Sequence, residues 1–285
     1  SYFSKLSNLQ TAILVPTEIL ADQHTITFKE MFLDYPVNVE CLKSNLPDEE
    51  KCRIIKSVSS GATDILIGTH SIIQDDVNFQ KLGLIIVDEQ HKFGINQRIT
   101  LTKKISKDFL FPHELYLSAT PIPRSLSLVL YEGLDYTVIN ELPKNRKLIH
   151  TQVISHNSRA ELYNQISNIL ENNEQVYWVC SCINYTESFE SEYVQGVFDE
   201  LSNRFSTATL GMLHGRAKSK DNTITMRKFF EGSIQILVCT TMIEVGVDVG
   251  NATCIVIEDS ERFGLSQLHQ LRGRVGRSNK QSYCY

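Results

Sequence analysis

Short runs of apolar residues alternate along the chain with longer stretches in which apolar residues recur every three or four positions. The short runs are typical of strands buried on both faces of a parallel sheet, and the wider spacing is typical of amphipathic helices. In the first half of the chain, this pattern predicts strands at residues 11–15, 37–42, 64–68, 82–88 and 114–118. Between them, helices are predicted at residues 19–32 and 47–59, the second with its N-cap within residues 45–48.

A second alternating series occupies the other half of the chain. Strands are predicted at residues 149–154, 175–180, 207–213, 234–240 and 253–258, and helices at residues 158–172, 187–204 and 218–231. The segment 140–147 separates the two series, because it is polar, contains Pro143 and has no periodicity. We therefore expect an α/β fold with two domains and mainly parallel sheets, one at residues 1–143 and the other at residues 148–285.

The composition fits this picture and narrows the possible partners. The chain has 285 residues, of which 42% are hydrophobic and 21% charged, as in ordinary globular domains. Its net charge of -5 means that any contact with DNA must come from local patches and backbone amides. The 7 cysteines form no Cys-x-x-Cys pair and are expected to be reduced. With no apolar run of roughly 18 residues and no signal-peptide pattern, we expect a cytoplasmic monomer without a membrane partner.

Two carboxylates, Asp88 and Glu89, follow the fourth predicted strand. In parallel α/β sheets, ligands bind at the carboxyl ends of strands. Paired carboxylates there are costly unless they serve a cation or a proton transfer. A magnesium–nucleotide site uses one carboxylate for the metal and a second group for the attacking water, and Asp88 suits the first role and Glu89 the second. The alternative is a solvated acidic turn, against which the preceding apolar strand and the nearby His91 both argue.

Ser118, Ala119 and Thr120 come directly after the fifth predicted strand. A hydroxyl group at this position would be able to bond to His91 and relay the state of a nucleotide. The alternative is a plain turn, and the tripeptide does not decide between the two by itself.

Hydroxyl and guanidinium groups also follow strands in the second half. Thr240 and Thr241 come after a buried strand, where hydroxyls can hold a phosphate, and Gly246 would allow the backbone to approach a ligand closely. Farther on, Arg274 and Arg277 lie three positions apart and are flanked by glycines. Their guanidinium groups suit phosphate oxygens, as arginine fingers do, and the alternative is a solvated basic patch.

In their order along the chain, these segments resemble motifs of the superfamily 2 helicases. The matching segments are Pro16-Thr17-Glu18, Gly68-Thr69-His70, Asp88-Glu89-Gln90-His91, Ser118-Ala119-Thr120, the run from Thr240 to Asp248, and Gln270-x-x-Gly273-Arg274-x-Gly276-Arg277. Finer features are similar to the RecG family of branch-migration helicases, above all Tyr177-Trp178-Val179-Cys180 and the pair Gln90-His91. Transcription-repair coupling translocases share many of the other features.

The resemblance implies two RecA-like lobes that bind and hydrolyse ATP, with Mg²⁺ held by Asp88 through the nucleotide. It implies catalytic roles for Asp88, Glu89, Gln270, Arg274 and Arg277, and nucleotide contacts also for His91, Gly246 and Asp248. It implies coupling between nucleotide and DNA by His91, Ser118, Ala119 and Thr120. It implies contacts with the DNA backbone by Pro16, Thr17, Glu18, Gly68, Thr69, His70, Thr240 and Thr241.

The expected activity is ATP-driven branch migration or fork reversal on branched DNA such as forks and Holliday junctions. Two alternatives stay open: a transcription-repair coupling translocase, and a non-catalytic module that uses a helicase fold to bind nucleic acid.

The phosphate-binding loop of such motors is missing from this sequence. That loop reads Gly-x-x-x-x-Gly-Lys-Ser/Thr, and no Gly-Lys dipeptide occurs in the chain. In the family, the strand matching residues 11–15 follows the helix of this loop, so we expect the loop upstream and expect little or no ATP hydrolysis by this chain alone. We also expect the first lobe to be less stable than the second, because a sheet that lacks a strand exposes its edge.

Overall fold

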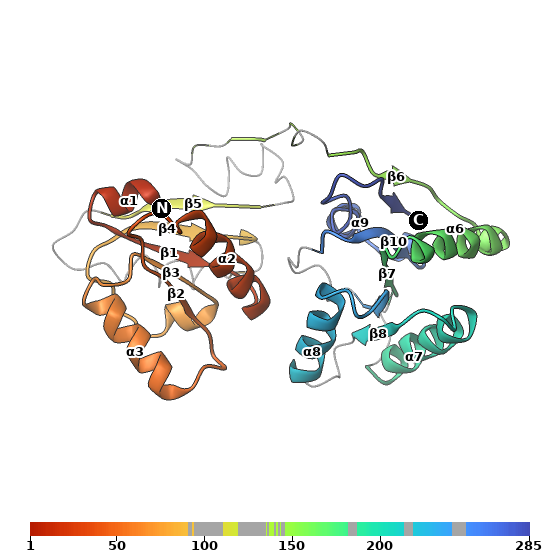
Figure 1. Ribbon diagram of the computed structural model, residues 1–285, viewed down its shortest axis with the longest axis horizontal. Helices are drawn as coiled ribbons and strands as arrows, with labels where there is room; N and C mark the ends of the chain where they lie inside the picture. The colour runs from red at the N-terminus through yellow and green to blue at the C-terminus, as the bar shows by residue number, and fades with distance from the viewer. Residues whose placement is uncertain are drawn as a thin grey trace. The chain divides into compact units, whose positions relative to one another are not determined.

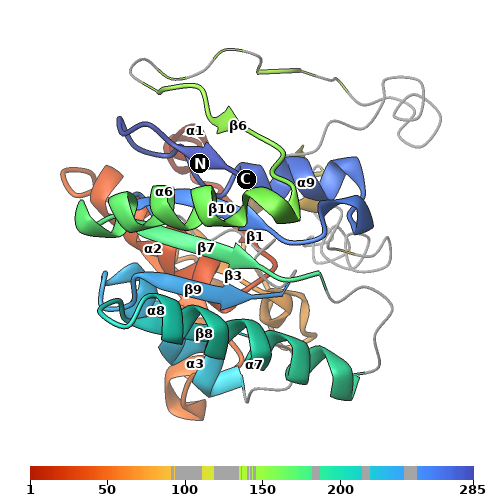
Figure 2. The ribbon, with the colours of Figure 1, turned by 90° about the vertical axis from the view of Figure 1, so that its right-hand side faces the viewer.

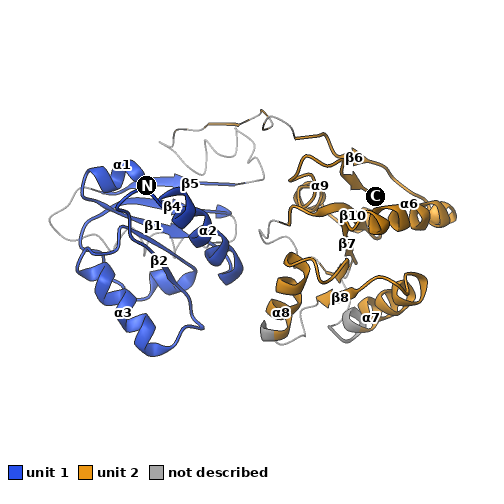
Figure 3. Ribbon diagram, viewed as in Figure 1, with its two compact units in different colours: residues 1–121 blue, residues 122–285 orange. Residues whose placement is uncertain are grey.

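The computed structural model describes residues 1–90, 93, 111–118, 135, 137–139, 141, 143, 146–181, 187–213, 219–240 and 249–285. The chain divides into two units, which we call unit 1 (Ser1–Pro121) and unit 2 (Ile122–Tyr285) (Figure 3). The predicted boundary at residues 143–148 falls partly outside the described residues and stays a prediction.

Unit 1 contains a 5-stranded sheet among its described residues (Figure 1). Its strands are β1 (Gln10–Leu14), β2 (Val39–Leu42), β3 (Ile65–Gly68), β4 (Leu82–Val87) and β5 (His113–Tyr116). Its helices are α1 (Tyr2–Leu6), α2 (Glu18–Met31), α3 (Asp48–Ser59) and the 3-10 helix η1 (His70–Ile73). The strands pair in the order β2-β3-β1-β4-β5, and every pair is parallel, as the apolar runs predict.

The strands of unit 1 are less buried towards one edge of this sheet. At its centre β1 is buried along its whole length, and Ile54 and Val58 of α3 pack into the same cluster as Leu14. β5 is the last strand of the sheet, and Leu115 within it is 47% exposed. A strand of a parallel sheet is normally buried on both faces. Among the described strands of this sheet, β5 is the least buried.

Unit 2 contains a 6-stranded parallel sheet among its described residues (Figure 2). Its strands are β6 (His150–Thr151), β7 (Gln175–Val179), β8 (Leu210–Leu213), β9 (Ile236–Cys239), β10 (Ala252–Ile257) and β11 (Tyr283–Cys284). Its helices are α6 (Arg159–Glu171), α7 (Glu187–Arg204), α8 (Ser219–Phe230), α9 (Leu265–Arg272) and the 3-10 helices η3 (His156–Ser158) and η5 (Ser260–Arg262). The strands pair in the order β6-β11-β10-β7-β9-β8.

Helices cover both faces of this sheet. Leu162 and Ile166 of α6 pack on the face that holds Trp178, together with apolar residues of α7. Tyr177 is the next residue along β7 and therefore points to the opposite face, where its ring lies 4.8 Å from that of Phe229 on α8. Trp178 and Tyr177 are both fully buried, so the central strand anchors the core on both sides.

The two units repeat one topology. If the 3-10 helices and α9, which lies between β10 and β11, are left out, the order β1-α2-β2-α3-β3-β4-β5 in unit 1 matches β7-α7-β8-α8-β9-β10-β11 in unit 2, and the matching strands have the same neighbours. Left-handed residues recur at matching places: Asn8 (φ 56°) and Asn173 (φ 55°) precede the first strands of the repeat. Glu89 (φ 49°) and Asp259 (φ 48°) follow β4 and β10. In unit 2, β6 pairs with the outer edge of β11, which is the strand that matches β5 in unit 1.

The helix and strand bounds agree with the sequence pattern to within a few residues, with three differences. Pro47 is the N-cap of α3 and lies in the predicted segment, but its side chain makes no capping bond. The strand expected at 149–154 has only the two residues of β6. Neither α1 nor α9 was predicted, because both are short and a short helix shows too few turns for a periodic pattern.

Candidate functional site

Asp88 lies directly after β4, beside the end of β1. Its backbone N–H donates to the carbonyl of Leu14 over 2.9 Å. Its Oδ1 accepts the backbone N–H of Glu89 at 2.9 Å, and its Oδ2 lies 3.3 Å from Nε2 of His24 on α2. A carboxylate held through both oxygens has a fixed orientation, as a metal ligand requires. Its remaining lone pairs suit Mg²⁺, which binds one or two carboxylates together with phosphate and water oxygens.

Glu89 is buried in an unusual backbone conformation. Its φ of 49° lies in the left-handed region, which costs a residue with a side chain on the order of 1 kcal/mol. Its exposed fraction is only 9%. Backbone strain at a buried carboxylate is typical of functional sites, where the surrounding structure holds a reactive group in place.

Gln90 continues this turn towards β5. Its backbone N–H donates to the carbonyl of Leu117 at 3.1 Å, and the Leu117 N–H donates to Val87 at 2.9 Å. The Gln90 side chain is buried, and its Nε2 has no hydrogen-bond acceptor among the described residues. Buried amide groups nearly always have a partner, so this nitrogen is available to a ligand or to a residue outside the described part of the chain.

Ser118 follows Leu117 and is exposed at the same edge of the sheet as Asp88. The structure therefore brings one of the predicted coupling residues to the predicted nucleotide edge. The other coupling residues, His91, Ala119 and Thr120, lie outside the described residues.

The first predicted DNA-contacting segment forms the start of α2. Thr17 is the N-cap residue, and its Oγ1 accepts the backbone N–H of Leu20 at 3.5 Å. Pro16 precedes it and Glu18 is the first helical residue. The free N–H groups at the start of a helix attract anions such as phosphate, so this position suits a contact with a nucleic-acid backbone.

The second predicted DNA-contacting segment adjoins the first. Gly68 ends β3, and its carbonyl accepts the N–H of Val15, next to Pro16, at 3.0 Å. A Cβ at Gly68 would lie 2.2 Å from the carbonyl oxygen of Leu42, so only glycine fits. Thr69 is buried after it, whereas His70 is exposed. Both segments thus lie at the carboxyl edge of the sheet of unit 1, like Asp88.

In unit 2, the predicted arginine pair follows α9. Gln270 lies in the last turn of α9, and Gly273 is the C-cap residue. Arg274 is only 4% exposed. Arg277 is half-buried, and its Nε donates to the carbonyl of Gly273 at 3.1 Å. The loop of these residues is therefore compact, and both guanidinium groups start from a fixed backbone.

Thr240 is buried directly after β9, at the carboxyl edge of the sheet of unit 2. Thr241, Gly246 and Asp248, the other predicted contact residues of this segment, lie outside the described residues.

A charged network that the sequence did not predict lies after β10. Glu258 accepts hydrogen bonds from the guanidinium of Arg159 at 2.8 and 3.3 Å, and from the indole of Trp178 at 2.9 Å. Burial lowers the pKa of Arg159, but the hydrogen bond with Tyr163 and the charge of Glu258 outweigh this effect and raise that pKa above its usual value. One signal for the network was available: Glu258 and Asp259 follow a buried strand just as Asp88 and Glu89 do.

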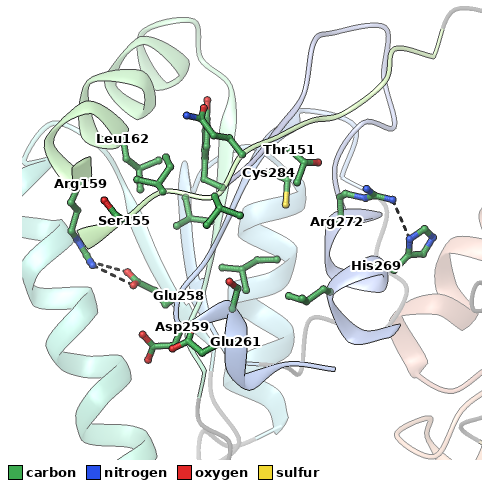
Figure 4. A pocket seen from close by; sticks show the side chains of 18 of the residues that line it. Thr151, Ser155, Arg159, Leu162, Glu258, Asp259, Glu261, His269, Arg272 and Cys284 are labelled. Carbon is green, nitrogen blue, oxygen red and sulfur yellow. Dashed lines mark hydrogen bonds and ion pairs between the residues drawn. The ribbon is translucent and has the colours of Figure 1, made fainter. Parts of the chain in front are cut away.

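A cavity of about 460 Å³ lies beside this network in unit 2 (Figure 4). Its walls come from the segment after β6, the start of α6, the end of β10, helix α9 and the end of β11. Arg159 and Glu258 lie on one side, and Arg272 and His269, which are bonded to each other over 3.1 Å, lie on the other (Figure 4). Arg159 therefore neutralises Glu258 in the wall of this cavity.

Two family models match the chain, and known proteins resemble most of it. Residues 2–129 match the DEAD/DEAH box helicase model, and residues 160–279 match the model of the helicase conserved C-terminal domain. The ATP-dependent DNA helicase RecG of Haemophilus influenzae is 41% identical over 276 residues, which cover 96% of this chain and 40% of that protein. RecG of Aquifex aeolicus is 44% identical over 279 residues, covering 98% of this chain and 35% of that protein. The chain belongs to the RecG-type superfamily 2 helicases.

Solved structures agree with this assignment. A structure of RecG bound to a three-way DNA junction has a TM-score of 0.80 and 39% identity, and covers 97% of this chain and 35% of that chain. The yeast (S. cerevisiae) protein Dbp5 L327V, bound to RNA and ADP BeF3, has a TM-score of 0.67 at 14% identity, which shows the shared fold alone. This chain spans 40% of the length of the Haemophilus influenzae protein and 35% of the length of the Aquifex aeolicus protein.

Membership in the RecG-type helicases implies nucleotide use, and the described residues are compatible with it. No group of three or more His, Cys, Asp and Glu side chains within the described ranges could hold a metal by itself. An ion bound at Asp88 would therefore need further ligands, such as water or phosphate oxygens. No helix in the described part of the chain is long and apolar enough to cross a membrane.

Proposed function

We propose that this RecG-type core belongs to a motor that hydrolyses ATP and uses the energy to drive branch migration or fork reversal. Its substrates would be branched DNA, such as forks and Holliday junctions. The observation that carries this proposal is the carboxylate pair at the mouth of β4, where Asp88 is held through both oxygens and Glu89 is buried in a left-handed conformation.

In this proposal, Asp88 holds Mg²⁺ together with the phosphates of ATP. The ion would supply positive charge to the phosphoryl group in transfer. Glu89 orients the attacking water and accepts its proton, which suits a buried carboxylate that cannot exchange freely with solvent. His91, Gly246 and Asp248 complete the nucleotide contacts.

Gln270, Arg274 and Arg277 contribute from unit 2. Guanidinium groups that bind the γ-phosphate stabilise the charge of the transition state, as arginine fingers do. The backbone of Arg274 and Arg277 is fixed by α9 and by the bond between Arg277 and Gly273, which lowers the cost of placing these charges.

DNA would bind along the starts of α2 and η1 and at the end of β9. Thr17 and Thr69 are the N-cap residues of α2 and η1, and backbone N–H groups there bind phosphates without a net positive charge. This accounts for DNA binding by a chain with a net charge of -5. The residues proposed for these contacts are Pro16, Thr17, Glu18, Gly68, Thr69, His70, Thr240 and Thr241, and those proposed to couple DNA to nucleotide are His91, Ser118, Ala119 and Thr120.

The test is DNA-stimulated ATP hydrolysis by the complete gene product, measured as phosphate release with and without a three-way junction. Glu89→Gln keeps the shape of the side chain but removes the base, so we expect hydrolysis to fall by about 10²-fold or more while ATP still binds. Glu50→Gln, on the exposed first turn of α3, is the matched control and should change nothing. Equal activity of Glu89→Gln and the unsubstituted protein would refute the proposal.

A non-catalytic module remains the second candidate, because the chain has no Gly-Lys dipeptide for a phosphate-binding loop. The chain by itself is expected to hydrolyse little or no ATP, and robust turnover by it would contradict this. Reading the upstream coding sequence separates the candidates: a phosphate-binding loop there supports a motor. A domain that binds RNA polymerase would instead support a transcription-repair coupling translocase.

A further inference from the structure

The segment at residues 146–152 of unit 2 runs alongside the loop after α9. The backbone N–H groups of His150 and Gln152 donate to the carbonyls of Ser282 and Cys284, each at 2.9 Å. One step earlier, the carbonyl of Leu148 accepts the side-chain amide of Gln281 at 2.9 Å. Figure 2 shows the result, with β6 lying next to the C-terminal end of the chain.

The same segment reaches the arginine loop itself. Nε of Arg146 donates to the carbonyl of Gly276, so its guanidinium holds the peptide bond between Gly276 and Arg277. Gly276 has a φ of 73° and so reverses the chain at this point. A Cβ on Gly276 would lie 2.8 Å from Cγ1 of Ile149, so the side chain of Ile149 covers this reversal closely.

The loop is therefore fixed from two sides. On one side, Arg277 bonds back to Gly273, at the end of α9. On the other side, Arg146 and Ile149 hold Gly276, which precedes Arg277 directly. Without the bond from Arg146, the peptide plane that leads into Arg277 would be free to turn, and the guanidinium at the end of a long side chain would move by a larger amount.

We propose that Arg146 is a positioning residue for the arginine pair: through the carbonyl of Gly276 it sets the direction from which Arg277 reaches the nucleotide. This inference rests on the function proposed above for Arg274 and Arg277.

Two variants test this proposal, each compared with a neighbour. Arg146→Ala removes the bond, and Arg146→Met keeps most of the length of the side chain but has no N–H donor. Lys147→Ala, the adjacent exposed residue, removes the same charge without touching Gly276 and is the matched control. Hydrogen exchange of the amides at residues 273–278 is measured in the chain described here. The kcat and KM of DNA-stimulated ATP hydrolysis are measured in the complete gene product.

We expect faster exchange at residues 273–278 in both Arg146 variants but not in Lys147→Ala, with an unchanged unfolding temperature of unit 2. We expect kcat to fall about tenfold or more at an unchanged KM for ATP, since a displacement of about 1 Å at a reacting centre costs on the order of 10²-fold. Full activity of both Arg146→Ala and Arg146→Met would overturn the positioning role.

The two proposals fail in different ways. If the unsubstituted gene product hydrolyses no ATP, the proposed function fails, and the catalytic part of this inference fails with it. If ATP is hydrolysed but exchange at residues 273–278 is the same in Arg146→Ala and Lys147→Ala, the inference alone is wrong.

Discussion

Replacing Glu258 by alanine should destabilise unit 2 far more than the loss of an ordinary surface carboxylate. Glu258 accepts two hydrogen bonds from Arg159 and one from the indole of Trp178. Its side chain is 10% exposed and that of Arg159 is 24% exposed, so both charges are largely withdrawn from water. Alanine would leave the guanidinium of Arg159 with only the longer ion pair to Glu200, at 3.7 Å, and would leave a buried indole N–H without an acceptor.

The size of the effect follows from these two losses. An unsatisfied buried N–H costs about 1–3 kcal/mol. Breaking a fully buried ion pair costs about 3–5 kcal/mol, but Arg159 keeps some contact with water, so we discount this to about 1–2 kcal/mol. We therefore expect Glu258→Ala to cost about 2–5 kcal/mol. Glu258→Gln should cost about 1–2 kcal/mol, because its amide oxygen can still accept from Trp178.

Thermal unfolding followed by tryptophan fluorescence measures this directly. The chain has 1 tryptophan, Trp178, and it is fully buried in unit 2, so its emission reports on that unit alone. A loss of about 2–5 kcal/mol should lower the midpoint by about 4–20 °C for a unit of this size. Glu231→Ala breaks the exposed pair with Arg227 and should change the midpoint very little. Equal shifts for Glu258→Ala and Glu231→Ala would refute this reasoning.

Three further predictions concern other parts of the chain. Gly68→Ala should destabilise unit 1 by about 1–3 kcal/mol, because its Cβ would lie 2.2 Å from the carbonyl oxygen of Leu42; unchanged hydrogen exchange in β1 would contradict it. Gly196→Ala, in α7 with nothing within 4 Å of the new Cβ, should stabilise unit 2 by about 0.5–1 kcal/mol and raise the midpoint seen by fluorescence. Burial raises the pKa of Cys284 from 9.0 to about 11. As the pH rises, the thiol of the unfolded chain loses its proton before the buried thiol of the folded chain does. The stabilisation of the folded state by the neutral thiol is therefore complete below pH 9.0 and is lost as the pH rises to about 11. The free energy of unfolding should fall in this window by up to about 1.4 kcal/mol per pH unit. Denaturant unfolding of Cys284→Ala between pH 8 and 10.5 should show a shallower decline, and identical slopes would contradict the prediction.

Matching positions of the two units hold acidic residues with different ion-pair partners. Asp88 and Glu89 follow β4, and Glu258 and Asp259 follow β10, with the second residue of each pair left-handed. In unit 2 the acidic group is neutralised from within by Arg159. In unit 1, the ion-pair partner of Asp88 among the described residues is a histidine, His24. Matching positions of one fold thus hold a carboxylate beside a histidine in unit 1 and a carboxylate paired with a guanidinium in unit 2.

The order of helices and strands was predictable, because burial in a parallel sheet leaves a periodic trace in the local sequence. The strand at residues 82–88 is found as β4, and the helix at 19–32 as α2. The strand expected at 149–154 is shorter, since pairing with the two-residue β11 limits its length. This limit depends on a neighbouring strand more than a hundred positions farther along the chain, which local periodicity does not register.

Part of the candidate site was predictable for the same reason. Ligand-binding residues follow strands, so Asp88, Glu89 and Ser118 were identified from their positions, and the structure brings them to one edge of unit 1. The contact of His24 with Asp88 was not predictable, because it joins a helix face to a strand end 64 residues away.

The sequence by itself determined the fold class, the repeated strand-and-helix order and the motifs of a RecG-type helicase, because these depend on local residue types and their spacing. Only the tertiary structure decided the left-handed turn at Glu89, the neutralised pair of Arg159 and Glu258, and the contact between Arg146 and Gly276. The last two join residues that are 99 and 130 positions apart. Contacts of this kind form only when packing of the whole unit brings distant backbone segments together, and no local pattern along the chain encodes them.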